Sequence, residues 1–398
     1  MLGYIIFFLL VIWCGLLGFY ASDLHRRWRE PVLRYPVLVI ESDDWGAGPL
    51  EQAQALDALR QVLKGHHDQT GRHPVMTVGV ILGIVDRAAM AAASPSDYVR
   101  LTLDDARLAT ALTALGAGIK EGVMVPQLHG LEHYWPPALM AAAETDEQVA
   151  AWLAGEGMAR SEDLPSHLQS RWTNAAALPS RPIPEVEINQ AAAQEAEIYA
   201  RIFGVAPTVA VPTTFVWNDA VERAWAAHGV ACIVTPGTRH ENRDGQGRPS
   251  GDGRTILNGE RGQSGVLYLV RDNYFEPALG HRAENGLAAL ARQTERGRPT
   301  LLETHRFNFL CAPIQAEAAL GELNRLLAEA CARYPTLRFL STQEIAEAMA
   351  GKDGAMIETE VRPRLRAWLA RIRTLPRFWK LARLSGLAMP LWLLGKVA

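Results

Sequence analysis

Two adjacent carboxylates and two histidines spaced four apart are the residues of this chain best suited to chemistry. Asp43 and Asp44 end the apolar run 37–40, and His129 and His133 flank the tripeptide Gly-Leu-Glu. Histidines four apart on one helical turn can reach one ion, and Asp44 could supply a third ligand. Three protein ligands leave a position for water. The pattern therefore favours a hydrolytic metal site.

Each motif also has a purely structural interpretation. An Asp pair ahead of a helix can close an Asx turn or cap the helix. A lone histidine pair is more often structural or exposed than metal-binding. The metal site is favoured only because both motifs occur together and the Asp pair ends a strand.

A third candidate group is Glu303-Thr-His305-Arg306, at the end of another apolar segment. Strand alternation places Glu303 and His305 on one face, so the carboxylate could orient or charge the imidazole. A histidine satisfied within the core is the alternative.

Alternating apolar and helical segments must position these groups. After the strand at 37–40, strands are expected at 74–84, 123–128, 207–215, 230–234, 266–270, 299–305 and 337–340. Helices are expected at 50–63, 137–157, 185–203, 284–296 and 315–334, and one more ends at His228. Polar residues follow the strands repeatedly. This order is typical of a parallel α/β barrel of seven or eight strands, here over residues 35–350.

The order of the three motifs resembles the polysaccharide deacetylase family, also called NodB homology or carbohydrate esterase family 4. The resemblance spans residues 37–308 and implies a deformed (β/α)7-8 barrel of the NodB type. It implies that Asp43 is the general base and His305 the general acid. By the same resemblance, the metal ligands would be Asp44, His129 and His133.

The chain departs from the family pattern at several positions. Glu-Ser-Asp-Asp-Trp-Gly at 41–46 replaces Thr-Phe-Asp-Asp-Gly, and Gly130 replaces Ser or Thr. The Arg-x-x-x-x-Pro motif has no clear counterpart at 211–218, so Arg239, Arg271 or Arg306 could replace its arginine. Candidates for binding substrate or orienting the base lie near strand ends: Trp45, Glu132, Trp217, Arg239, Arg271, Asp272, Glu303, Arg306 and Asn308. Trp135 and Tyr274 are further aromatic candidates for stacking on sugar rings.

The expected function is metal-dependent deacetylation of an acetylated sugar in a polysaccharide, glycan or glycan-lipid precursor, with zinc as the first choice of metal. One alternative is a non-catalytic, membrane-associated glycan-binding module. The other is a zinc peptidase with the His-x-x-Glu-His motif, in which Glu132 would be the base. That motif needs a continuous helix, which the strand before His129 and the glycine at 130 disfavour.

Charge is distributed unevenly along the chain. From Val361 onward there are nine Lys and Arg and no acid, which leaves 31 basic against 43 acidic residues before it. An acidic body argues against nucleic acid as a partner, since backbone phosphates require a basic face. The four cysteines show no framework spacing, so no disulfide is expected.

Both terminal segments suggest a membrane as a partner. Residues 1–22 carry no charged side chain and are long enough for a single-pass N-terminal transmembrane helix, with a cleaved signal peptide as the alternative. Arginines at 26, 27, 29 and 34 would place the body on the cytoplasmic side. The tail, 359–398, is expected to be a basic amphipathic helix, either on anionic lipid or packed on the barrel.

Overall fold

A nine-stranded sheet is the centre of the fold in the computed structural model, which describes residues 2–92 and 98–397. The strand order is β10-β7-β6-β5-β2-β1-β12-β11, β13 also pairs with β1, and the paired strands are parallel. The bounds are β1 Val37–Gly46, β2 Met76–Ile81, β5 Met124–Leu128, β6 Val209–Ala210, β7 Cys232–Thr235, β10 Leu267–Val270, β11 Asn273–Tyr274, β12 Thr300–His305 and β13 Arg338–Phe339. Two small hairpins pair β3 (Gly83–Val85) with β4 (Arg100–Thr102) and β8 (Asn242–Arg243) with β9 (Pro249–Ser250).

The sheet curls into an incomplete barrel. Its edge strands, β10 and β11, are consecutive in the chain and are separated only by Arg271 and Asp272. Two residues span only about 10 Å even when fully extended, so the two edges must lie close together. No ladder joins β10 to β11 within the described ranges. The curled parallel sheet with flanking helices expected from the sequence is therefore present, but it has nine strands in place of seven or eight, and one seam is left open.

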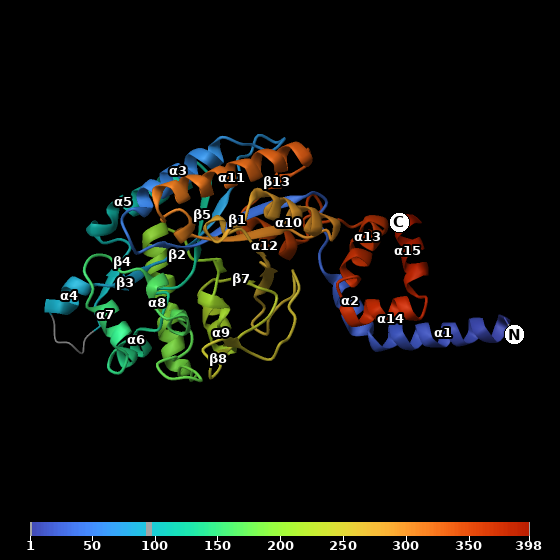
Figure 1. Cartoon of the computed structure of the whole chain (residues 1–398), viewed down its shortest axis with the longest axis horizontal. Helices are drawn as coiled ribbons and strands as arrows, with labels where there is room; N and C mark the ends of the chain where they lie inside the picture. Colours follow the sequence, from blue (N-terminus) through green and yellow to red (C-terminus); the bar gives the residue numbers. More distant parts are fainter. Residues whose placement is uncertain (1, 93–97, 398) are drawn as a thin grey trace.

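Helices cover the outside of the curled sheet (Figure 1). The helices of the body are α3 Gln52–Lys64, α4 Arg87–Ala92, α5 Ala109–Lys120, α6 Pro136–Ala143, α7 Glu147–Leu153, α8 Glu185–Phe203, α9 Asp219–Ala227, α10 Ala283–Glu295, α11 Pro313–Arg333 and α12 Thr342–Gly351. Their apolar faces and the outward side chains of the strands form the larger core, which includes Leu38 and Ile40.

The barrel interior changes from apolar to charged along β1. The inward positions are Val37 and Val39, then Glu41 and Asp43. The two valines pack with side chains of β6, β7 and β10 and with Ile345 of α12. The apolar end secures the fold, and the charged end lies where the strands terminate.

The strand expected at 207–215 is much shorter than predicted. Only Val209–Ala210 pairs with its neighbours, and Thr213–Phe215 forms a 3-10 turn. Pro207 and Pro212 lack the amide hydrogen that a ladder requires, so β-branched composition alone overestimated the strand. Thr214 and Phe215 have φ of 52° and 56°, which places them in the left-handed region.

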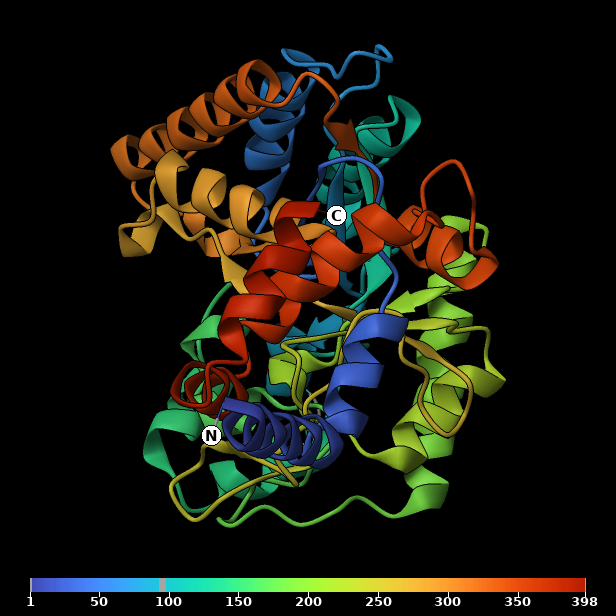
Figure 2. The ribbon, with the colours of Figure 1, turned by 90° about the vertical axis from the view of Figure 1, so that its right-hand side faces the viewer.

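The two chain termini form one helical unit at the end of the body (Figures 1 and 2). This helical unit consists of α1 Leu2–Phe19, α2 Ala21–Arg29, α13 Val361–Ile372, α14 Pro376–Leu384 and α15 Ala388–Val397. It has its own apolar core, which includes Leu24, Leu369 and Phe378. The sequence treated these segments as separate anchor and tail, but packing joins them.

One buried arginine fixes the helical unit to the barrel. Arg371 of α13 is fully buried and donates to the carbonyls of Arg27, Glu30, Pro31, Arg296 and Gly297. These carbonyls belong to α2, to the segment leading into β1 and to the turn before β12. The helical unit therefore lies at the amino ends of the strands, opposite their carboxyl ends.

The single span predicted for residues 1–22 is not found as one membrane-crossing helix. Among the described helices, none is by itself long and apolar enough to cross a membrane; only the pair Ile6–Phe19 and Ala21–Arg29, bent by 62°, meets that test jointly.

Candidate active site

A bulge at the end of β1 turns both carboxylates of the Asp pair toward one pocket. The register of β1 with β2 shifts between Ser42 and Trp45, and Asp44 has a φ of 74°. In a regular strand, Asp43 and Asp44 would point to opposite faces. The extra residue of the bulge and the left-handed conformation of Asp44 remove that alternation, at an expected cost of about 1–3 kcal/mol. Backbone strain at this point is consistent with a functional role.

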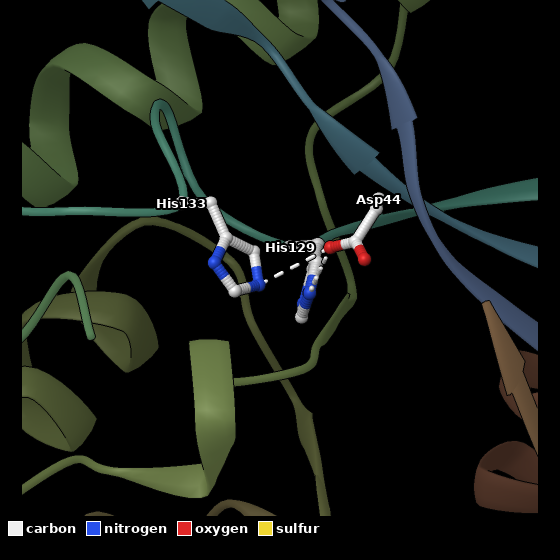
Figure 3. A group of neighbouring side chains, drawn as sticks. All are labelled: Asp44, His129 and His133. Carbon is white, nitrogen blue, oxygen red and sulfur yellow. Dashed lines mark ion pairs between the residues drawn. The ribbon is translucent and has the colours of Figure 1, made fainter. Parts of the chain in front are cut away.

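The two histidines meet Asp44 from the loop after β5 (Figure 3). His133 Nε2 lies 3.1 Å, and His129 Nε2 3.5 Å, from Asp44 Oδ1. His129 Nδ1 lies 2.9 Å from the carbonyl oxygen of Val211. A proton on Nδ1 satisfies that carbonyl, so the lone pair of Nε2 faces Asp44.

These three side chains fit a divalent cation. Their ligand atoms all lie within 4.8 Å of one another, and all three residues are buried. Asp44 Oδ1 and His129 Nε2 make no hydrogen bond, although they are buried and close together. Buried polar atoms normally have partners, and here a shared ion would provide one. Two imidazoles and one carboxylate form a donor set that zinc accepts.

The electrostatics of the cluster keep its carboxylate ionised. Burial alone would raise the pKa of Asp44, but His133 and His129 hold it well below its usual range. Burial would lower the pKa of His129, and the charges of Asp43 and Asp44 outweigh that effect and raise it. An anionic Asp44 is the form that binds a metal.

Arg271 holds the second carboxylate of the pair. Its Nη2 lies 2.6 Å from Asp43 Oδ2, its Nη1 lies 2.9 Å from Glu41, and its Nε lies 3.3 Å from Glu303. Burial opposes ionisation of Asp43, but the guanidinium keeps its pKa below the ordinary value. Of the three arginines proposed from the sequence, only Arg271 contacts Asp43. It occupies the seam between β10 and β11.

His305 faces the Asp pair from the neighbouring strand. It pairs with Asp43 in the register of β1 with β12. Its Nδ1 lies 2.6 Å from Glu276, whereas Glu303, the partner expected from the sequence, is 3.8 Å from Nε2. Burial would lower the pKa of His305, but the hydrogen bond to Glu276 and the charge of Asp44 raise it to about 10. Glu276 had no recognisable sequence signal.

Replacement of Glu276 should move the alkaline limb of the pH–rate profile. With Glu276→Gln, the anionic partner that raises the pKa of His305 is lost, whereas the lowering by burial remains. Protonated His305 should then disappear at lower pH, so activity should fall earlier on the alkaline side. Comparison of the profile with that of Glu284→Gln, an exposed acid, controls for general charge effects. An unshifted alkaline limb would exclude this role for Glu276.

A single cavity of about 330 Å3 brings together Asp43, Asp44, His129, His133 and His305. The lining comprises Asp43, Asp44, His129, His133, Glu162, Gln169, Pro212, Thr214, Phe215, Arg271, Glu303, His305 and Phe307. Sequence reasoning missed Glu162 and Gln169, which come from a polar loop with no motif, and Thr214 and Phe215, which were assigned to a strand. Gly79 of β2 could have been recognised from the sequence, because a glycine inside a strand often marks a close approach by another group. A Cβ there would lie 2.2 Å from Asp43 Oδ1.

Several sequence candidates lie away from the cavity. Trp45 and Trp217 are fully buried in the core, so neither is available to stack on a sugar ring. Arg239 pairs with Asp219 and Glu241. The remaining candidates bind other side chains and do not line the cavity themselves. Asp272 accepts hydrogen bonds from Asn273 and Gln293, Arg306 forms an ion pair with Glu162, and Asn308 donates to Glu276. Trp135 is also buried, and Tyr274 is half exposed outside the cavity lining.

Glu132 is part of the scaffold of the histidine loop. It is fully buried and pairs with Arg100 and with Arg171. Residues 129–135 form an irregular turn between β5 and α6, and Gly130 has a φ of 122°. Both carboxylate oxygens of Glu132 are occupied and the required helix is absent from this described segment. The geometry of a His-x-x-Glu-His peptidase is therefore not present.

The chain is similar to several solved structures at low sequence identity. No protein-family model and no curated protein matches the chain. A polysaccharide deacetylase from Mycobacterium smegmatis is 13% identical with a TM-score of 0.41, covering 80% of this chain and 91% of its own. Peptidoglycan deacetylase PdaC from Bacillus subtilis is 12% identical with a TM-score of 0.38, covering 81% and 95%. A 4-alpha-glucanotransferase from Thermococcus litoralis is 10% identical with a TM-score of 0.39, covering 79% and 40%. Polysaccharide and peptidoglycan deacetylases are thus among the matches.

Proposed function

We propose that this chain is a metal-dependent hydrolase that removes an acetyl group from an acetylated sugar of a polysaccharide or glycan precursor. The observation that carries the proposal is the convergence of an Arg-held carboxylate, an Asp-His-His cluster and an acid-paired histidine in one cavity. Each of these groups has a distinct task in hydrolysis of an amide or ester.

Asp43 and His305 each carry out one of the two proton transfers. A divalent cation held by Asp44, His129 and His133, for which zinc is our first choice, would polarise the acetyl carbonyl and lower the pKa of the attacking water. Asp43, kept ionised by Arg271, accepts the proton of that water. His305, kept protonated by Glu276, donates a proton to the departing nitrogen or oxygen of the sugar. The base and acid lie side by side on β1 and β12.

The size and walls of the cavity suit a small acyl group attached to a sugar. Its 330 Å3 is at the lower end of the range for small-molecule sites. Phe215 and Phe307 provide apolar wall, and Glu162 and Gln169 offer polar groups. The cavity thus has room for one acetylated sugar residue and polar groups for its hydroxyls.

Release of acetate from acetylated chito-oligosaccharide, peptidoglycan and acetyl-xylan tests this function. We expect the zinc-loaded full chain to release acetate from at least one, and Asp43→Asn to reduce turnover about 100- to 1,000-fold through loss of the base. Metal content should be unchanged, because Asp43 is not a ligand. Acetate release by Asp43→Asn at the wild-type rate would contradict the proposed role of Asp43 as the base. Sugar binding without acetate release would favour the glycan-binding module.

The helical unit supports a second proposal, that the chain associates with an anionic membrane. Its outer surface exposes large apolar side chains: Tyr4, Ile6, Phe7, Phe8, Leu10, Val11, Ile12 and Phe19 of α1, and Leu384, Met389, Trp392, Leu393 and Leu394 of α14 and α15. Apolar side chains next to an excess of Lys and Arg are typical of surfaces that bind anionic lipid. The arginines after α1 favour the cytoplasmic face.

Vesicle binding tests this association. The full chain should co-sediment with phosphatidylglycerol-containing vesicles, and Phe7→Asp combined with Leu10→Asp should reduce the bound fraction strongly, because two exposed apolar contacts become anionic. The matched control is Val186→Asp combined with Val205→Asp, exposed apolar positions on the body. An equal loss of vesicle binding in the two double variants would contradict a role for the helical unit in membrane association.

A further inference from the structure

A cavity with several basic side chains lies at the junction between the helical unit and the barrel. It measures about 550 Å3 and is separate from the candidate active site. Its walls come from α2, the 258–261 loop, β10, the end of α12 and the start of α13. The charged residues of the lining are Arg26, Arg29, Glu30, Glu260, Arg261, Lys352, Glu358 and Arg364. Neither the proposed hydrolysis nor the exposed apolar surface uses this cavity.

The carboxylates of the cavity are already satisfied. Glu30 is buried and pairs with Arg298 at 2.7 Å. Glu260 accepts from Arg26 at 2.7 and 2.8 Å. Glu358 pairs with Arg34 at 3.7 Å and accepts the backbone amides of Thr359 and Glu360. Each acid of the lining therefore already has an arginine partner.

Four cations of the lining have no carboxylate partner among the described residues. They are Arg29, Arg261, Lys352 and Arg364. Arg261 and Arg364 are oriented by the carbonyls of Gly265 and Trp28, and Arg29 and Lys352 are exposed at the rim. Unpaired cations around one hollow in an otherwise acidic body create a local positive potential.

The cavity also has an apolar wall, formed by Pro31, Leu267, Met349 and Ile357. A cationic rim with an apolar wall matches a ligand that carries a phosphate and a hydrocarbon portion. The position supports the same conclusion, because α2 is nine residues, or about 14 Å, long and connects the cavity directly to α1.

We propose that this cavity binds a phosphate-bearing headgroup, with the phosphate held by Arg29, Lys352 and Arg364. The shared chemistry is a phosphate ester or phosphate ion, and the assignment to a lipid source rests on the membrane association proposed above. Binding at this place would fix the orientation of the helical unit on the bilayer, while the candidate active site lies at the opposite ends of the strands.

Calorimetric titration of the full chain with soluble short-chain phosphatidylglycerol and with inorganic phosphate tests the site. We expect phosphatidylglycerol to bind, and Arg29→Gln combined with Lys352→Gln to weaken it about tenfold through loss of two charged contacts. The matched control, Lys120→Gln combined with Arg248→Gln, removes two exposed cations outside the cavity lining and should bind as the wild type does.

The two ligands and the variants separate the outcomes. Equal affinity for inorganic phosphate and phosphatidylglycerol, weakened in the Arg29 and Lys352 variant, would support the phosphate site and assign it to soluble phosphate. Absence of binding by both ligands, or equal affinity in all variants, would overturn it. Acetate release measured on the same proteins should be unchanged, so failure of this site is distinguishable from failure of the proposed hydrolysis.

Discussion

Asp44→Ala should abolish both metal binding and acetate release. Asp44 Oδ1 is the atom that the two imidazoles face, at 3.1 and 3.5 Å, and it is the only carboxylate in the described cluster. Without it, two histidines remain, which is too few for a stable three-ligand site. Metal content by mass spectrometry should fall from about one zinc per chain to near zero, and turnover should fall below detection.

Two further proteins make this result interpretable. Asp44→Asn preserves the shape of the side chain, so it tests whether loss of metal follows from charge and not from misfolding at the strained bulge. Asp272→Ala removes another acid close to a strand end that lies outside the cavity, and it should retain metal. Stoichiometric metal in a folded Asp44→Ala protein would contradict the assigned cluster and place the ion elsewhere.

Arg271→Met should combine a large loss of stability with a loss of activity. Arg271 is buried and contacts Glu41, Asp43 and Glu303, all of them buried. Removal of the only guanidinium in this described group leaves three carboxylates without their cation. Breaking a buried ion pair from one side costs about 3–5 kcal/mol, so we expect a reduction of that size in the free energy of unfolding.

The same substitution should change the protonation of Asp43, the proposed base. The guanidinium opposes the effect of burial on the pKa of Asp43, so its loss should raise that pKa and move the acid limb of the pH–rate profile to higher pH. Arg271→Lys keeps the positive charge but loses the planar guanidinium that binds several carboxylates at once, so this variant should fold with reduced activity. Arg239→Met is the control, because its partners are half exposed and its loss should cost about 1 kcal/mol or less. Equal destabilisation by Arg271→Met and Arg239→Met would contradict the central role of Arg271.

Much of the fold could be predicted from the sequence because the signals are local. Apolar runs and helical periodicity predicted α8 at its observed bounds and most body strands to within a few residues. The three motifs also predicted which side chains gather, because the carboxyl ends of neighbouring parallel strands lie at one edge of the sheet. Asp43, Asp44, His129, His133 and His305 do line one cavity. Their chemical roles remain predictions.

Contacts between distant residues were decided by tertiary structure alone. The sequence offered three arginines for the base, and only the curl of the sheet brings Arg271, at the seam, to Asp43 on β1. It offered Glu303 as the partner of His305, but the register of β11 and β12 places Glu276 closer. Composition could not show that Trp45 and Trp217 point into the core, nor that both termini pack into one helical unit. Periodicity specifies which face of an element is apolar, whereas strand register, bulges and sheet curvature determine which faces meet.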